Sequence, residues 1–173
     1  MGAQLTDIHR PLPFLNNGVA QIAFIVEDLD EALEMYHSRF NVGGWDVYTY
    51  QRPLVSHMTY MGVDADYAMR IGLSYFGTMR IELIQPLRGP SVYHDHIERN
   101  GYGIHHLGVL VDDMHAALGE AEQAGFRMIM DGAGFGLDGD GHYAYLDTED
   151  TLGVMYELIE RPKARREPEK RYP

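Results

Sequence analysis

The chain has no cysteine among its 173 residues, which excludes disulfide bonds and metal sites built from thiolates. It has no apolar run long enough to span a membrane and no secretory signal at its start, so we expect a cytoplasmic protein. Positive charge is scarce, because the chain has 14 Lys and Arg but 26 Asp and Glu, which gives a net charge of −12. Such a chain is unsuited to nucleic acid, whose phosphates require a basic surface.

The two ends differ in composition from the rest of the chain. Residues 161–173 hold six Lys or Arg and two Glu, a net charge of +4 that leaves −16 for the remainder. They predict a charged C-terminal tail that is either solvated or packed on a partner subunit. Residues 1–17 hold two prolines and few apolar residues, and predict an extended N-terminal arm.

A repeat lies between these ends. Residues 21–33 align with residues 106–118, so that Val26 meets Val111, Asp28 meets Asp113 and Leu33 meets Leu118. In both copies an apolar strand runs into an acidic turn, which is followed by a helical pattern. Because a repeat determines the architecture more firmly than any single residue, we expect two similar structural units.

The sequence of each unit predicts one strand, one helix and three further strands. The first helix, residues 29–40, begins with a capping box formed by Asp28 and Glu31. The later strands are predicted at 45–51, 68–76 and 79–85, and in the second unit at 126–130, 142–146 and 153–160. The sequence thus predicts an α+β domain, residues 18–160, whose two βαβββ modules (18–88 and 103–160, with a linker at 89–102) form a curved, barrel-like sheet.

Four polar side chains occupy corresponding positions on the strands of the two modules. Since side chains alternate along a strand, Gln21, Glu82, His106 and Glu157 all fall on the sheet face away from the helices. Taken singly, each is most often a solvated or hydrogen-bonded residue. Together, two carboxylates, an imidazole and an amide suit one divalent cation, because the ligand charge of −2 balances the metal.

With these residues in view, the chain resembles the vicinal oxygen chelate superfamily, the glyoxalase, bleomycin-resistance and dioxygenase group. The resemblance covers residues 18–160 and is carried by the runs 21–32, 80–86, 106–113 and 145–158. It implies paired βαβββ modules around a cleft, one metal held by Gln21, Glu82, His106 and Glu157, and a homodimer. The ligand set is similar to those of glyoxalase I and methylmalonyl-CoA epimerase.

Two positions depart from the glyoxalase I pattern. Ile25 stands where that pattern has a glutathione-binding arginine, and Pro86 stands where it has a companion asparagine. These departures argue against glutathione as a substrate component, and the region after Arg80 is more similar to the epimerase-like branch.

The resemblance leaves three functional hypotheses. The first is a lyase, isomerase or epimerase that uses Zn, Ni, Co or Mn to stabilise an enediolate or enolate of a small carbonyl compound or thioester, with Glu157, and Glu82 second, as the catalytic carboxylate. The second is an iron-dependent extradiol-type dioxygenase, which would need His105 or His142 as a second histidine ligand. The third is a metal-free binding protein of the resistance type.

Overall fold

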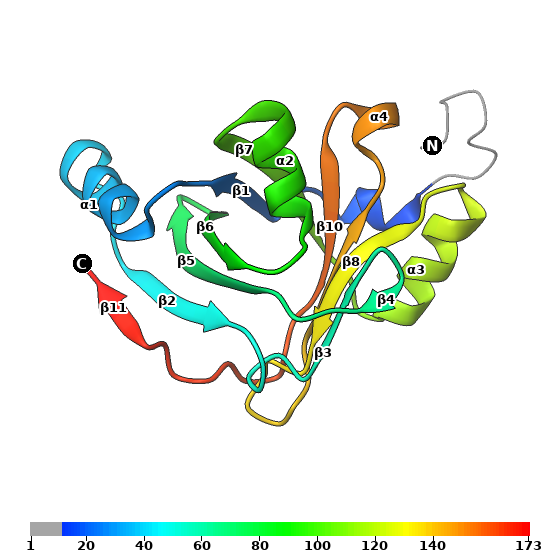
Figure 1. Cartoon of the computed structure of the whole chain (residues 1–173). Coiled ribbons are helices and arrows are strands. Elements are labelled where there is room, and N and C mark those ends of the chain that lie inside the picture. Colours follow the sequence, from blue (N-terminus) through cyan, green and yellow to red (C-terminus); the bar gives the residue numbers. More distant parts are fainter. Residues whose placement is uncertain (1–11) are drawn as a thin grey trace.

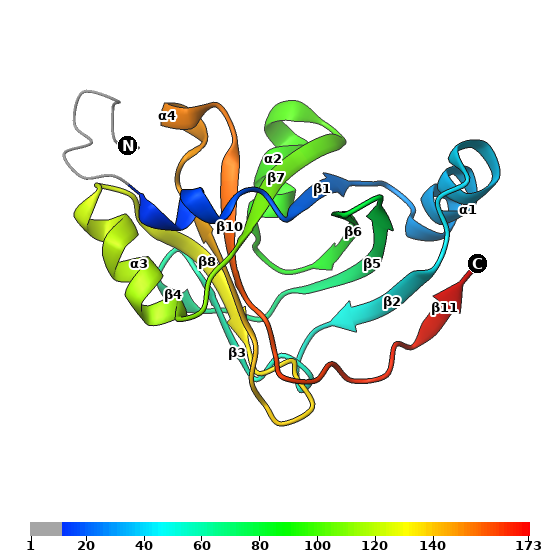
Figure 2. The same cartoon turned by 180° about the vertical axis from the view of Figure 1, so that it is seen from behind.

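The computed structural model describes residues 12–173 and shows one mixed sheet curled into a half-barrel (Figures 1 and 2). The strands are β1 (Gln21–Ile25), β2 (Trp45–Tyr50), β3 (His57–Tyr60), β4 (Val63–Asp64), β5 (Ala68–Phe76), β6 (Met79–Arg88), β7 (Gly103–Leu110), β8 (Met128–Ala133), β9 (His142–Leu146), β10 (Met155–Glu160) and β11 (Lys170–Tyr172). The helices of this part of the chain are η2 (Pro13–Asn17, a 3-10 helix), α1 (Leu29–Phe40), α2 (Val92–Asn100), α3 (Met114–Gln123) and α4 (Glu149–Leu152). In residues 12–173, no helix combines the length and the apolar character needed to cross a bilayer.

The strand order follows the sequence repeat. In the first half the strands lie in the order β2-β5-β6-β1, and in the second half in the order β8-β9-β10-β7. The first strand of each half pairs in parallel with the last, β1 with β6 and β7 with β10. The halves join where β1 and β7 run antiparallel. The predicted α+β architecture of two βαβββ modules is therefore confirmed.

One helix of each half covers the outer face of the sheet. Asp28 caps α1 by accepting a hydrogen bond from the Glu31 amide at 2.9 Å, as the capping box predicts. Leu29 and Leu33 of α1 pack with Ile81 and Leu83 of β6, so the predicted helix-facing side of that strand is confirmed. In the second half α3 packs in the same way on apolar side chains of β7 and β10.

The inner face of the half-barrel is filled by segments that the repeat does not contain. Residues 52–67, which the sequence left unassigned, contribute Val55, Met58 and Tyr67 to the inner core, and α2 contributes Val92 and Tyr93. Strand β3 leaves the first half and pairs with β8 of the second half. The inserted segment thus joins the two halves a second time, away from the β1–β7 seam.

Both ends of the described chain differ from the prediction. The tail was expected to be solvated or to pack on a partner subunit, but β11 pairs with β2 of the same chain. The Glu169 carboxylate holds it there, because it accepts hydrogen bonds from the Thr49 amide and hydroxyl, both at 2.9 Å. Of the predicted extended N-terminal arm, residues 1–11 lie outside the described residues. Residues 13–17 are not extended but form η2, which buries Phe14 against the α3 core.

The packing of α1 makes a testable prediction about stability. Leu33 is fully buried against the sheet, so Leu33→Ala should lower the free energy of unfolding by about 2–5 kcal/mol. Met35 lies on the same helix and is 43% exposed, so Met35→Ala should change it by less than about 0.5 kcal/mol. Urea unfolding of both variants measures the difference, and equal effects would contradict the assignment of the buried face.

Candidate metal centre

The structure brings Gln21, Glu82, His106 and Glu157 together on the inner face at the seam between the halves. The Gln21 Nε2 atom donates hydrogen bonds to Oε2 of Glu82 and Oε2 of Glu157, both at 2.9 Å. The His106 Nε2 atom lies 3.4 Å from the same Glu82 oxygen and 3.1 Å from the same Glu157 oxygen. All four side chains are buried, with His106 fully inaccessible. Four side chains that are far apart in the sequence thus contact one another in one cluster.

Strand register explains the convergence. Gly108 of β7 is the Cα partner of both Gln21 and Glu157, and Ala23 of β1 is the partner of both Glu82 and His106. Small residues at these crossings leave room for the polar side chains. A Cβ atom on Gly108 would lie 2.9 Å from Cβ of Gln21 and 3.3 Å from Oε2 of Glu157. Glycine is therefore required at position 108 for the four side chains to approach one another.

Burial makes the charges of the cluster interdependent. Burial alone lowers the pKa of His106, but the negative charge and hydrogen bond of Glu157, with Glu82, outweigh it and raise this pKa to about 9. Burial raises the pKa of Glu82, and the nearby Glu157 charge raises it further against the opposing hydrogen bond with His106. Two carboxylates so close together need a positive charge beside them, and the raised pKa of His106 reflects this need.

The same donor set fits a divalent cation. Glu82, His106 and Glu157 each offer one ligand atom, and these atoms lie within 4.8 Å of one another. The amide of Gln21 would turn its oxygen inward by rotating about its last side-chain bond. Two anionic oxygens, one imidazole nitrogen and one amide oxygen match the preferences of Mn, Co, Ni or Zn ions.

His105 and Tyr145 contact the His106 ring on the side away from the carboxylates. The Nδ1 atom of His105 lies 2.9 Å from Nδ1 of His106, so one ring donates to the other. Burial lowers the pKa of His105, which keeps that ring neutral and able to accept. The Tyr145 ring lies across the His106 ring, with centroids 5.1 Å apart, and its hydroxyl pairs with that of Tyr93 at 2.8 Å. These contacts fix the orientation of Nε2 toward the carboxylates.

The histidines considered as alternative ligands do not join the cluster. His105 lies behind His106 and contacts α2 instead. The Nε2 atom of His142 donates to Oδ2 of Asp131 at 2.7 Å, and His57 lies 3.3 Å from the same oxygen. This group sits on the neighbouring strands β3, β8 and β9, where Thr59 also donates to Asp131. His142 therefore has a structural partner rather than a place beside Gln21.

Two cavities lie near the inner core. The cavity that adjoins the cluster has room for about 20 Å³, roughly one water molecule. Besides Gln21, Glu82 and Glu157 it is lined by Tyr50, Ile71, Leu73, Arg80, Phe135, Tyr143, Ile159 and Arg165. Phe135 and Arg165 were not predicted as part of this lining, because they come from the loop after β8 and from the C-terminal tail.

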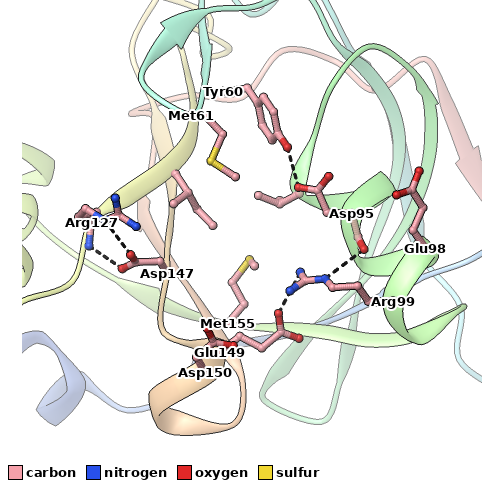
Figure 3. A pocket seen from close by; sticks show the side chains of 12 residues that line it. Tyr60, Met61, Asp95, Glu98, Arg99, Arg127, Asp147, Glu149, Asp150 and Met155 are labelled. Carbon is pink, nitrogen blue, oxygen red and sulfur yellow. Dashed lines mark hydrogen bonds and ion pairs between the residues drawn. The ribbon is translucent and has the colours of Figure 1, made fainter. Parts of the chain in front are cut away.

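The second cavity is larger, about 490 Å³, and opens between α2, α4 and the start of β8 (Figure 3). Its floor is apolar, and its rim carries charged groups that pair with each other. Arg99 lies 3.1 Å from Glu149, and Arg127 lies 3.0 Å from Asp147. Met155, two residues before Glu157 on β10, lines this cavity and is the Cα partner of His106.

The chain is similar to known proteins over most of its length. The model of the glyoxalase/bleomycin resistance protein/dioxygenase superfamily matches residues 20–145. An uncharacterized protein of Bacillus subtilis, YqjC, is 28% identical over 93 residues, which are 53% of this chain and 66% of that protein. The match thus spans slightly less than two thirds of that relative.

Solved structures share the fold. Methylmalonyl-CoA epimerase from Mycobacterium tuberculosis superposes with a TM-score of 0.58 at 24% identity, covering 84% of this chain and 89% of its own. A mutant of 4-hydroxymandelate synthase from Streptomyces coelicolor also gives 0.58, at 18% identity, over 85% of this chain and 40% of its own. At such identities the likeness shows the fold alone.

The Asp131 group predicts a pH dependence of stability. Burial would raise the pKa of Asp131, but hydrogen bonds from His142 and Thr59 lower it below its usual value of 3.8. The stability that the carboxylate contributes is therefore present above pH 3.8 and is lost as pH falls further. Asp131→Asn should cost about 1–3 kcal/mol at pH 7, and the difference should shrink below pH 3.8.

Unfolding free energies measured from pH 3 to pH 7 check this dependence. Asp138 is exposed in the loop after β8, so Asp138→Asn serves as the control and should stay within about 0.5 kcal/mol of the parent. A difference for Asp131→Asn that stays constant down to pH 3 would show that the native carboxyl has an ordinary pKa.

Proposed function

Because the chain belongs to the glyoxalase/bleomycin resistance protein/dioxygenase superfamily, we propose that it is a divalent-metal-dependent epimerase, isomerase or lyase of a small carbonyl compound or thioester. One observation carries the proposal: two buried carboxylates and a buried imidazole converge on one point, with an amide completing the set. Two buried carboxylates need a positive charge beside them, and a divalent cation would supply it.

The proposed ligands are Gln21, Glu82, His106 and Glu157. A divalent ion held by them would act as a Lewis acid for negative charge that develops on substrate oxygens. His106 presents Nε2 to the site, since Nδ1 is engaged by His105. The apolar and aromatic walls from Tyr50, Phe135 and Tyr143 would exclude water from the reacting carbon.

The proton of that carbon needs an acceptor, and we assign this role to Glu157. Glu157 occupies the position in the second module that Glu82 occupies in the first, and both carboxylates line the small cavity beside the cluster. Either carboxylate can gain basicity when a substrate weakens its other contacts. Glu82 is the second candidate, and an epimerisation that removes a proton from one face and returns it to the other could use both.

The dioxygenase alternative requires a second histidine ligand. Among residues 12–173, His106 alone joins the two glutamates in a group that could hold a metal. His142 is committed to Asp131 and His105 to the rear of His106. The observed set therefore favours enolisation chemistry over ring cleavage. A homodimer and a cytoplasmic location remain predictions that rest on the family resemblance and the composition.

Metal analysis is the first test. The parent protein, loaded with Zn or Mn and dialysed, should retain one ion per chain, whereas His106→Ala should lose it, because the only imidazole donor is gone. His142→Ala removes a histidine outside the cluster and should keep the parent's stoichiometry. Full occupancy in His106→Ala would refute this site, and a parent that binds no metal would favour the resistance-type hypothesis.

The second test separates ligation from proton transfer. Glu157→Gln keeps the size and one ligating oxygen but removes the base, so it should keep most of the metal and lose turnover on the order of a hundredfold. Deuterium incorporation from heavy water into an acyl-CoA thioester, with methylmalonyl-CoA as the first substrate tried, measures the step. Glu82→Gln is run beside it at equal metal occupancy. Parent-like exchange by Glu157→Gln would mean that Glu157 only holds the metal.

A further inference from the structure

Two arginines line the small cavity beside the proposed metal ligands. Arg80 is 8% exposed and stands two residues before Glu82 on β6. Arg165 comes from the C-terminal tail and reaches the same cavity from the other side. Its guanidinium donates to the Tyr50 hydroxyl at 3.0 Å and lies against the rings of Tyr48 and Phe135, at 5.9 and 5.7 Å.

The fold holds Arg165 in place from both sides. Before it, the Lys163 amide donates to Asp140 at 2.8 Å, and the Ala164 carbonyl accepts from Leu137 at 2.9 Å. After it, Glu169 and β11 attach the tail to β2, so the tail crosses the lower end of the half-barrel (Figure 1). Arg165 also forms a bridge with Gly136 in the loop after β8. A long surface side chain would need no such support.

The guanidinium groups at this end make no direct ion pair with a carboxylate of residues 12–173, although the charge of Glu82 acts on both Arg80 and Arg165. Among the described residues, neither Arg80, Arg161 nor Arg165 forms an ion pair, whereas Arg99 and Arg127 at the larger cavity are both paired (Figure 3). The pKa of Arg161 is lowered, first by burial and then by the charges of Arg80 and Arg165. Guanidinium groups gathered without a counter-ion are arranged for an anion that the chain does not supply.

The charges around the cavity indicate that a ligand bound there carries a negative charge. A divalent ion would neutralise Glu82 and Glu157, and the two arginines of the cavity would then be left with a charge of +2. We infer that Arg165, together with Arg80, binds an anionic group of the substrate, a carboxylate or a phosphate, while the substrate's carbonyl end faces the metal ligands. This inference rests on the proposed function and adds to it the class of substrate and the residues that select it.

The small size of the cavity means that a side chain in its wall must move when a substrate binds. With room for roughly one water molecule, the cavity cannot admit an organic substrate unless a wall moves. One wall is the Arg165 side chain, which can change its rotamer while the hydrogen bonds of Lys163 and Ala164 hold the backbone of the tail. A substrate that enters past this wall displaces the Arg165 side chain from the Tyr50 hydroxyl. The N–H groups of the guanidinium are then available to donate hydrogen bonds to the substrate.

The test compares two chelators that differ in charge. Propionohydroxamate and succinyl monohydroxamate both bind a divalent ion through the hydroxamate, but the second carries a carboxylate at its far end. Titration calorimetry on the zinc-loaded protein should show the charged compound binding at least about tenfold more tightly. Arg165→Gln should remove most of that preference, and Arg165→Lys should keep part of it, because the charge stays while the planar fork is lost.

Arg127→Gln is the matched control. It removes the same charge from the larger cavity, where the arginine is 66% exposed and already paired with Asp147, and it should leave the preference unchanged. Zinc content and near-ultraviolet circular dichroism of each sample establish that the variants are loaded and folded. An Arg165→Gln protein that has lost its fold is replaced by Arg165→Lys and Arg80→Lys, which should each weaken the preference.

The outcomes separate this inference from the function on which it rests. Equal affinities for the two hydroxamates on loaded parent protein, or a preference that survives in Arg165→Gln, would overturn the role of Arg165 and leave the metal-dependent function standing. Failure of both compounds to bind to fully loaded protein would overturn the proposed chelation chemistry and the inference with it.

Discussion

The structure depends on the burial of two carboxylates and an imidazole at the seam between its halves. Glu82 and Glu157 are each less than one tenth exposed, and each approaches His106 and Gln21 from a different half. Such a group is stable only when every charge has a partner at short range, which demands accurate strand register. The antiparallel pairing of β1 and β7 meets this demand, and Gly108 leaves the space for it.

The repeat explains why much of this could be predicted from the sequence. Alternation along β1, β6, β7 and β10 is a local property, so the faces of Gln21, Glu82, His106 and Glu157 follow from their positions in the strands. The matching acidic turns at Asp28 and Asp113 locate both helices. Asp28 caps the first helix as expected, and Asp113 caps the second in the same way. Where the sequence carries the same pattern twice, each copy supports the reading of the other.

Features without a counterpart in the repeat were not predicted. Residues 52–67 have no clear period, and their strand β3 exists because β8 of the other half offers an unpaired edge. The basic composition of the tail indicates solvent exposure, yet β2 offers an edge to β11 and Asp30 an ion pair to Lys170 at 3.0 Å. Arg165 and His105 owe their places to such tertiary contacts, which leave no periodic signal in the sequence.

The closure of both sheet edges by distant segments has a consequence for how the chain folds. Ser56 beside β3 meets Ala133 across 77 residues of sequence, and Thr49 on β2 meets Glu169 across 120. Closing such long loops is entropically expensive and slows folding, so these edges should be sealed after the two modules have formed. Until residues 170–172 have paired with β2, that strand presents an open edge, and the chain is then more exposed to aggregation and to chaperones.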